Sequence, residues 1–195
     1  MTTAAGKHTL VALLEDRPGA LNRVVSLFRR RGFNIESLTV GHTETPGISR
    51  LTMVVDGATT IVEQVVKQLY KIIDVIKVSD ITDDETVSRE LALIKVSATS
   101  STRGEIMQIV DIFRAKIVDV APDSMIVEAT GPTDKIDSLV LLLRSFGIKE
   151  MVRTGRVAMV RGMAGVTRVD EEPAQLQKYR VLTRPHKKVG TSNGV

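Results

Sequence analysis

The sequence repeats one order of predicted elements, and this internal repeat constrains the fold more than any single motif. In each half, an apolar run of strand length precedes an amphipathic helical pattern, two strands joined by a turn, a second helical pattern and a final strand. When the two halves are aligned without gaps, Ile35 corresponds to Ile117 and Gly57 corresponds to Gly131. The spacing between the first and second halves is smaller for the second pair, which indicates a shorter central hairpin in the second half. This order is typical of the split βαβ arrangement. We therefore expect an α+β protein with two tandem ferredoxin-like βαββαβ domains, each with its helices on one face of an antiparallel sheet.

The repeat also predicts where the domains begin and end. In the first half, the patterns predict strands over 8–15, 34–42, 48–56 and 75–81 and helices over 18–31 and 59–72. In the second half, they predict strands over 91–98, 117–120, 125–129 and 148–153 and helices over 103–115 and 131–146. The acidic stretch 82–86 is interpreted as a linker, and the stretch 154–162 as an exit without an element of its own. We expect domains over 8–82 and 83–162, followed by a basic polar tail over 163–195 that is predicted to be disordered.

Composition excludes several classes of protein. The 195 residues include no cysteine, which excludes disulfides, thiolate metal sites and a cysteine nucleophile. No apolar run approaches the length of a membrane span, and the first ten residues lack the features of a signal peptide, so we expect a cytoplasmic protein without a membrane partner. The net charge of +4 divides into +2, −1 and +3 over 1–82, 83–162 and 163–195. Because no region is strongly basic, we expect no nucleic acid as a main partner.

The reactive side chains do not form a recognisable catalytic set. The only histidines are His8, His42 and His186, and no metalloprotease, nucleophile-elbow, Walker A or dinucleotide-binding motif is present. Glu15 and Asp16 are adjacent on a strand end, where side chains point apart rather than face each other. His42 and Glu44 could supply two ligands of a metal site, which needs three or four. The alternative interpretation is that both are solvent-exposed residues at the end of a strand. We expect no catalytic site and no metal or cofactor of the chain's own.

One turn in the first half has the residue types of an amino-acid site. Asp16 is a favourable helix-cap type, Pro18 suits a first helical turn, and Gly19 leaves the backbone accessible. Free N–H groups at a helix N-terminus attract anions, so Asp16 can face an ammonium while the amides face a carboxylate. The alternative interpretation is an ordinary strand-to-helix connection. The corresponding turn of the second half, 99–104, lacks both the acid and the proline, so only the first half carries this candidate site.

Two sequence motifs resemble a known family. Leu-Glu-Asp-Arg-Pro-Gly-Ala-Leu (14–21) and Arg-Gly-Phe-Asn-Ile-Glu-Ser-Leu-Thr-Val (31–40) resemble ACT domains, and more narrowly the regulatory small subunit of acetolactate (acetohydroxyacid) synthase. Further similar stretches lie at 50–53, 68–71, 112–115 and 118–120, so the resemblance covers about 8–162. It implies a partner, the thiamine-diphosphate-dependent catalytic subunit, which the chain activates and places under feedback inhibition by valine. It also implies that thiamine diphosphate, magnesium and FAD belong to that partner.

The resemblance further implies an effector site between paired ACT domains of a homodimer. The implied valine-binding residues are Asp16, Gly19, Ala20, Leu21, Asn34 and Ile35. Relatives often have asparagine where this chain has Asp16, which changes the charge of the site. Asn34 and Ile35 are expected to serve the turn of the paired copy. Ala20, Leu21 and Ile35 are candidates to contact the branched side chain, and a core position is the alternative role for Leu21 and Ile35.

Two other functions are compatible with this fold. The first is a stand-alone amino-acid-sensing ACT module that acts on another enzyme or on transcription, but no helix-turn-helix pattern accompanies the repeats. Salt-dependent DNA binding would favour it. The second is a small enzyme of ferredoxin-like fold, which would require turnover of a substrate by the isolated chain.

Overall fold

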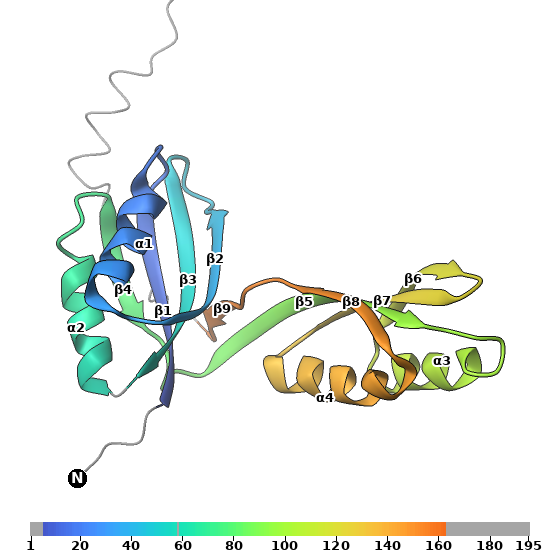
Figure 1. Ribbon diagram of the computed structural model, residues 1–195. Coiled ribbons are helices and arrows are strands. Elements are labelled where there is room, and N and C mark those ends of the chain that lie inside the picture. Colours follow the sequence, from blue (N-terminus) through green and yellow to red (C-terminus); the bar gives the residue numbers. More distant parts are fainter. Residues whose placement is uncertain (1–5, 58, 163–195) are drawn as a thin grey trace, which may run out of the picture.

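The chain forms two antiparallel sheets, each covered on one face by two helices. The computed structural model describes residues 6–57 and 59–162, and the predicted tail over 163–195 lies outside the described residues (Figure 1). The first sheet has the strand order β2-β3-β1-β4 and consists of β1 (Gly6–Glu15), β2 (Ile35–His42), β3 (Ile48–Gly57) and β4 (Val75–Asp80). Its helices are α1 (Ala20–Arg31) and α2 (Thr59–Leu69).

The second unit repeats this arrangement. Its sheet has the order β6-β7-β5-β8 and consists of β5 (Thr86–Ser97), β6 (Lys116–Ala121), β7 (Ser124–Gly131) and β8 (Ile148–Arg153). Its helices are α3 (Arg103–Ile112) and α4 (Thr133–Leu143), and a 3-10 turn, η1 (Arg144–Phe146), follows α4. A short strand, β9 (Val157–Val160), pairs with β5 outside the main strand order. The prediction of two tandem ferredoxin-like units in an α+β protein is confirmed.

The central strand β1 carries the core of the first unit. Alternate residues of a strand point to opposite faces, and Leu10, Ala12 and Leu14 all lie in the cluster beneath the helices. From α1, the buried side chains Val24 and Phe28 pack into the same cluster. The second core is built in the same way from β5, β7 and the two helices, by aliphatic residues that include Ile94, Val127, Ile106, Ile136 and Leu143. Both cores are mostly aliphatic, as the scarcity of aromatic residues predicts, with Phe28 as a buried aromatic member of the first.

Several element boundaries differ from the sequence-based expectation. The strand expected to begin at residue 91 begins at Thr86, and 157–160 forms β9 rather than an exit without structure. Residues 86–89 of β5 pair with β9, from Thr86 opposite Val160 to Arg89 opposite Val157. Residues 86–89 do not cover a core beneath helices. They therefore lack the alternation of apolar and polar residues from which the strands were predicted. The second helix, predicted to reach residue 72, ends at Leu69, and Ile73 beyond it is 66% exposed.

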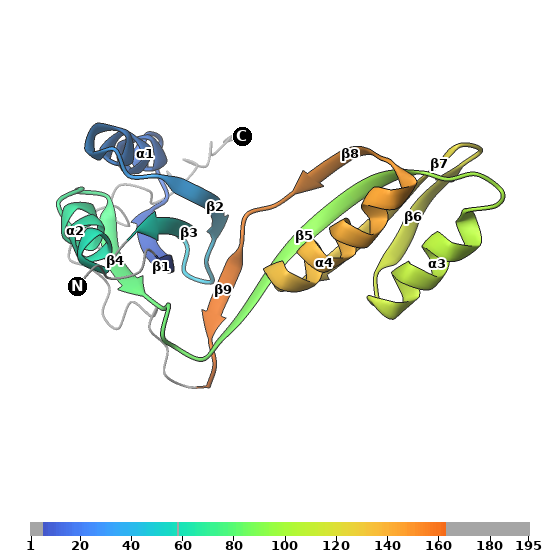
Figure 2. The same cartoon turned by 60° about the horizontal axis from the view of Figure 1, so that its bottom comes forward.

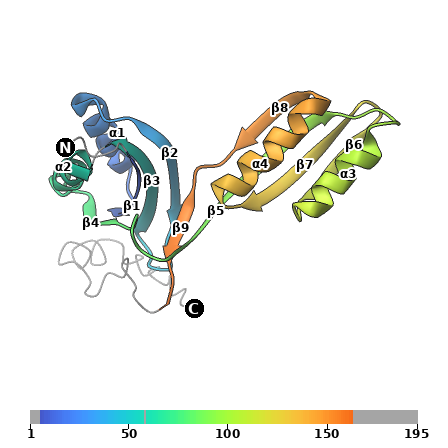
Figure 3. The same ribbon diagram turned by 90° about the horizontal axis from the view of Figure 1, so that it is seen from below.

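The β5–β9 ribbon joins the two units. Figure 2 and Figure 3 show β9 between the first sheet and the second unit, alongside the start of β5. Ala158 and Val160 of β9 form a small apolar cluster with Val11 and Ile81, on the face of the first sheet that the helices do not cover. The chain therefore returns from the end of the second unit to the first.

Candidate functional site

The turn between β1 and α1 is organised around Gly19. Gly19 has a φ of +88° and is the N-cap of α1, without a side-chain hydrogen bond to the helix. A left-handed conformation favours glycine because a Cβ would be strained there. The helix begins at Ala20, so the prediction that Pro18 lies in its first turn and that Asp16 caps it is wrong. The reason is that Asp16 is drawn away from α1 by partners on the neighbouring strands.

Asp16 faces the loop between β2 and β3. Its amide donates a hydrogen bond to the Gly47 carbonyl at 2.8 Å, and its Oδ1 accepts one from Ser49 Oγ at 3.2 Å. Its Oδ2 lies 3.2 Å from Nδ1 of His42, whose side chain is 83% exposed. The Asp16 side chain itself is 43% exposed. The carboxylate is thus fixed in direction yet accessible, with one exposed partner that a ligand cation can displace.

The first amides of α1 supply the complementary group. The Ala20 amide donates to the Arg17 carbonyl at 3.2 Å, whereas the amides of Leu21 and Asn22 have no hydrogen-bond partner among the described residues. A Cβ placed on Gly19 would meet nothing within 4 Å, so the backbone faces open space. A carboxylate can approach these donors without displacing a side chain. An accessible acid and free amides on one turn suit an α-amino acid better than a simple anion.

A buried carboxylate that the sequence did not single out holds this turn in place. Asp74, in the loop before β4, has a fully buried side chain and accepts hydrogen bonds from both Arg17 and Arg23. Its carbonyl accepts the Glu15 amide at 2.9 Å, and Arg17 Nε lies 3.1 Å from Glu15 Oε2. The feature of the sequence that could have indicated this role is that Asp74 is a single acidic residue within the otherwise apolar stretch 72–76.

The environment of Asp74 favours its charged form. Burial alone would raise the pKa of this carboxyl, but the hydrogen bonds from Arg23 and Arg17 and the charges of both guanidinium groups outweigh burial. The pKa of Asp74 therefore lies below its ordinary value. Asp74 also neutralises Arg23, a cation in the first turn of α1, where the helix dipole disfavours positive charge.

Within one chain, the six residues expected at the effector site do not come together. Ala20 is buried at the turn, and Leu21 is 38% exposed beside it, so the core role for Leu21 is wrong. Asn34 is exposed and Ile35 packs partly buried against the core. Ile35 is paired with Val55, whereas the end of β1 is paired with Ile48, so the two groups are separated by roughly 23 Å along β3. The expectation that Asn34 and Ile35 serve a second copy stays a prediction.

Other kinds of site find little support in the described part of the chain. Across 6–57 and 59–162, no cluster of three or more histidine, cysteine or acidic side chains has the arrangement of a metal site. His42 is paired with Asp16 rather than with Glu44. Among the same residues, no helix is long and apolar enough to cross a membrane.

Comparison with known proteins places the chain in a family. The family described as the AHAS small subunit-like ACT domain matches residues 10–77, and the family described as the small subunit of acetolactate synthase matches residues 89–162. A probable acetolactate synthase small subunit from Archaeoglobus fulgidus is 58% identical over 156 residues, which are 80% of this chain and 98% of that protein. The chain belongs to the family of acetolactate synthase small subunits. A relative from Mycolicibacterium smegmatis is 49% identical over 166 residues, 85% of this chain and 98% of the relative.

A solved small subunit has the same fold. The crystal structure of the acetolactate synthase small subunit from Thermotoga maritima superposes with a TM-score of 0.75 at 43% identity, covering 80% of this chain and 98% of that one. In this small subunit, the ACT match contains the turn at Gly19 and the buried Asp74. The second match contains β9 and begins at residue 89, the last residue of β5 that pairs with β9.

Proposed function

We propose that this chain is a regulatory subunit that binds the thiamine-diphosphate-dependent catalytic subunit of acetolactate synthase, raises its activity and confers feedback inhibition by valine. Membership of the small-subunit family supports the choice of partner. The observation that carries the effector proposal is the turn itself, where the accessible carboxylate of Asp16 and the free amides of Leu21 and Asn22 lie on either side of Gly19. These groups match the two charges of a free amino acid.

Each part of valine has a proposed place. Its ammonium replaces the exposed His42 beside Asp16, and its carboxylate accepts hydrogen bonds from the first amides of α1. Leu21, which is 38% exposed, provides apolar surface for the branched side chain, and the buried Ala20 supports the turn beneath it. Asn34 and Ile35 complete the site from a second copy of the chain, in a homodimer formed through the ACT domains.

The catalytic chemistry belongs to the partner in this proposal. Thiamine diphosphate, magnesium and FAD are bound by the catalytic subunit, and this chain has neither a cofactor nor a reaction of its own. The chain acts by shifting an equilibrium between two arrangements of the complex, one active and one inhibited. Valine inhibits only if it binds the inhibited arrangement more tightly than the active one. The proposed place of action is the cytoplasm.

The substitution Gly19→Asp tests the site. The new side chain would be strained at a φ of +88° and would place a carboxylate where the ligand carboxylate binds. We expect loss of valine binding in calorimetric titration of the chain, and loss of valine inhibition in the complex, with activation of the catalytic subunit retained. Gly41→Ala is the control, because its Cβ meets nothing within 4 Å on an ordinary strand. Full valine sensitivity of Gly19→Asp would refute the site.

A further inference from the structure

The segment Gly155–Val160 holds the two units together through polar contacts with both. Its central residue is Arg156, which lies just before β9. Arg156 Nη1 donates to Thr9 Oγ1 in β1 at 3.2 Å, and Nη2 donates to Thr133 Oγ1 at the start of α4 at 2.9 Å. The Arg156 amide donates to Ser37 Oγ in β2 at 2.9 Å. One residue is therefore hydrogen-bonded to two strands of the first unit and to a helix of the second.

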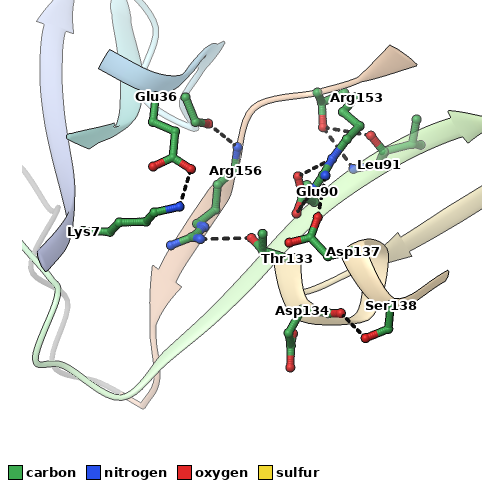
Figure 4. A network of polar contacts seen from close by, with 12 residues as sticks. Lys7, Glu36, Glu90, Leu91, Thr133, Asp134, Asp137, Ser138, Arg153 and Arg156 are labelled. Atoms are coloured by element: carbon green, nitrogen blue, oxygen red, sulfur yellow. Dashed lines mark hydrogen bonds and ion pairs between the residues drawn. The ribbon is translucent and has the colours of Figure 1, made fainter. Parts of the chain in front are cut away.

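The charged side chains around Arg156 pair within their own units. Lys7 and Glu36 of the first unit form an ion pair at 2.6 Å, and Arg153 of the second unit lies 2.8 Å from Glu90 and 2.6 Å from Asp137. Figure 4 shows Arg156 between these two groups, reaching toward Thr133. The same side chains line a cavity of about 440 Å³ between the units. Because the ion pairs do not cross it, the bridging contact in this cavity is that of Arg156.

The backbone of this segment approaches the first sheet too closely for a side chain at Gly155. A Cβ on Gly155 would lie 2.2 Å from Thr39 Oγ1 and 2.7 Å from the Leu38 carbonyl oxygen. A rotation of Thr39 would relieve only the first of these contacts, since the second is with backbone. Glycine at this position is therefore required by the close approach of the segment to β2.

A chain of contacts connects the candidate effector turn to the same segment. Asp16 accepts a hydrogen bond from Ser49. The next residue, Arg50, points to the opposite face of the sheet and donates from Nη2 to the Ala158 carbonyl of β9 at 2.6 Å. Through β9 and its partner β5, this contact continues into the second sheet. These contacts form a continuous connection along β3 from Asp16 to the segment that bridges the units.

We propose that Gly155–Val160 is a clamp that fixes the orientation of the two units and couples the effector turn to the second unit. The coupling part rests on the proposed function, whereas the fixed orientation does not. The clamp has the properties of a releasable contact. The Arg156 side chain donates only to neutral hydroxyl acceptors, and its Nε is buried without a partner among the described residues. A buried unsatisfied donor lowers the net stability of this contact below that of a fully paired one.

The first test measures the orientation directly. Because the chain contains no cysteine, spin labels are placed at Gln64→Cys on α2 and Gln108→Cys on α3, both exposed, without further substitutions. Double electron–electron resonance on the full chain, diluted with unlabelled protein to suppress distances between copies, should give one narrow distribution. Arg156→Ala and Gly155→Ala should broaden it.

Matched controls accompany both substitutions. Arg144→Ala removes an exposed arginine away from the clamp, and Gly41→Ala adds a methyl group in open space on β2. Thr133→Val removes only the acceptor in the second unit and leaves the first unit intact, so it replaces Arg156→Ala if that variant does not fold. Narrow, unshifted distributions in Arg156→Ala, Gly155→Ala and Thr133→Val would overturn the clamp.

The second test measures coupling in the reconstituted complex with its catalytic subunit. Arg156→Ala and Thr133→Val should bind valine in calorimetry as the original chain does, yet require at least tenfold more valine for half-inhibition. Unchanged inhibition in both variants would overturn the coupling. Absence of valine binding by the original chain and its complex would instead refute the proposed effector and the coupling with it, while the spin-label distances still decide the clamp.

Discussion

Asp74 accepts a hydrogen bond from Arg23 across the end of the first sheet, although the two residues lie 51 positions apart in the sequence. Arg17 donates to the other oxygen of the same carboxylate. Both arginines belong to the turn and first helical residues that form the candidate effector site, and Asp74 belongs to the loop before β4. The geometry of the site therefore depends on a charge outside it.

Removal of this charge should destabilise the first unit. Asp74→Ala leaves Arg17 and Arg23 without their buried partner, and breaking a buried ion pair on one side costs about 3–5 kcal/mol. Arg23 is half-exposed and can be partly resolvated, so we expect the lower end of this range. Urea unfolding measures the change. Glu63→Ala, which removes an exposed pair with Lys67 on α2, should change stability by less than about 0.5 kcal/mol. Equal effects of the two substitutions would contradict the structural role of Asp74.

The same carboxylate predicts a pH dependence of stability. The pKa of Asp74 is lowered from its ordinary value of 3.8 in the folded chain, so folding favours the charged form. The stabilisation that Asp74 provides is fully present above about pH 4, the pKa of an aspartate in an unfolded chain. This stabilisation is lost as the pH falls through the lower pKa of Asp74 in the folded chain. The difference in unfolding free energy between the original chain and Asp74→Asn should be constant near neutral pH and shrink below about pH 4. A difference that grows on acidification would have the wrong sign.

The fold was predictable because both units depend on regular patterns. Apolar residues recur with strand and helix periods around each core, and the order of elements occurs twice. The β5–β9 ribbon was not predictable, because Thr86 and Ser88 pair through their backbones and cover no core. The clamp was not predicted for a related reason. Arg156 has no distinctive sequence context, and only the fold brings it to Thr9 and Thr133.

The candidate site was predictable only in its local part. Asp16 and Gly19 lie on one turn, so their residue types and spacing were sufficient to suggest an amino-acid site. The partners that orient them, Ser49 and Asp74, come from distant parts of the chain. No local sequence pattern predicts such long-range pairs. For this reason Asp16 was wrongly predicted to cap α1, whereas its side chain points to Ser49 on β3.

The contact between His42 and Asp16 leads to a prediction about affinity. If valine places its ammonium at Asp16, it competes with His42, and His42→Ala should strengthen valine binding. Even an exposed ion pair contributes at most about 1 kcal/mol, so the gain from removing this contact is at most about fivefold. Calorimetric titration provides the measurement. His8→Ala is the control, because His8 makes a similar contact with Asp80 toward the other end of β1. Weaker binding in His42→Ala would mean that His42 is itself part of the site.

The exposed side of α1 leads to a prediction about assembly. The strand order makes β2 an edge of the first sheet, and edge strands are templates for pairing with another chain. Both elements carry exposed apolar side chains, since Val40 on β2 is 41% exposed and Val25 on α1 is 39% exposed. A homodimer formed through the ACT domains would join two such edges, cover these side chains and bring Asn34 and Ile35 of one copy toward the turn of the other.

Val25→Glu tests this assembly, because a buried interface does not tolerate an unpaired charge. We expect sedimentation velocity to show a dimer for the original chain and a monomer for Val25→Glu, together with loss of valine binding. Ile61→Glu on α2 is the matched control, since Ile61 is also 39% exposed but lies on the other helix, and it should remain dimeric. A monomeric Ile61→Glu with a dimeric Val25→Glu would place the interface on α2. In that case Asn34 and Ile35 would have no route to a second turn, and the site would have to be completed by the catalytic subunit.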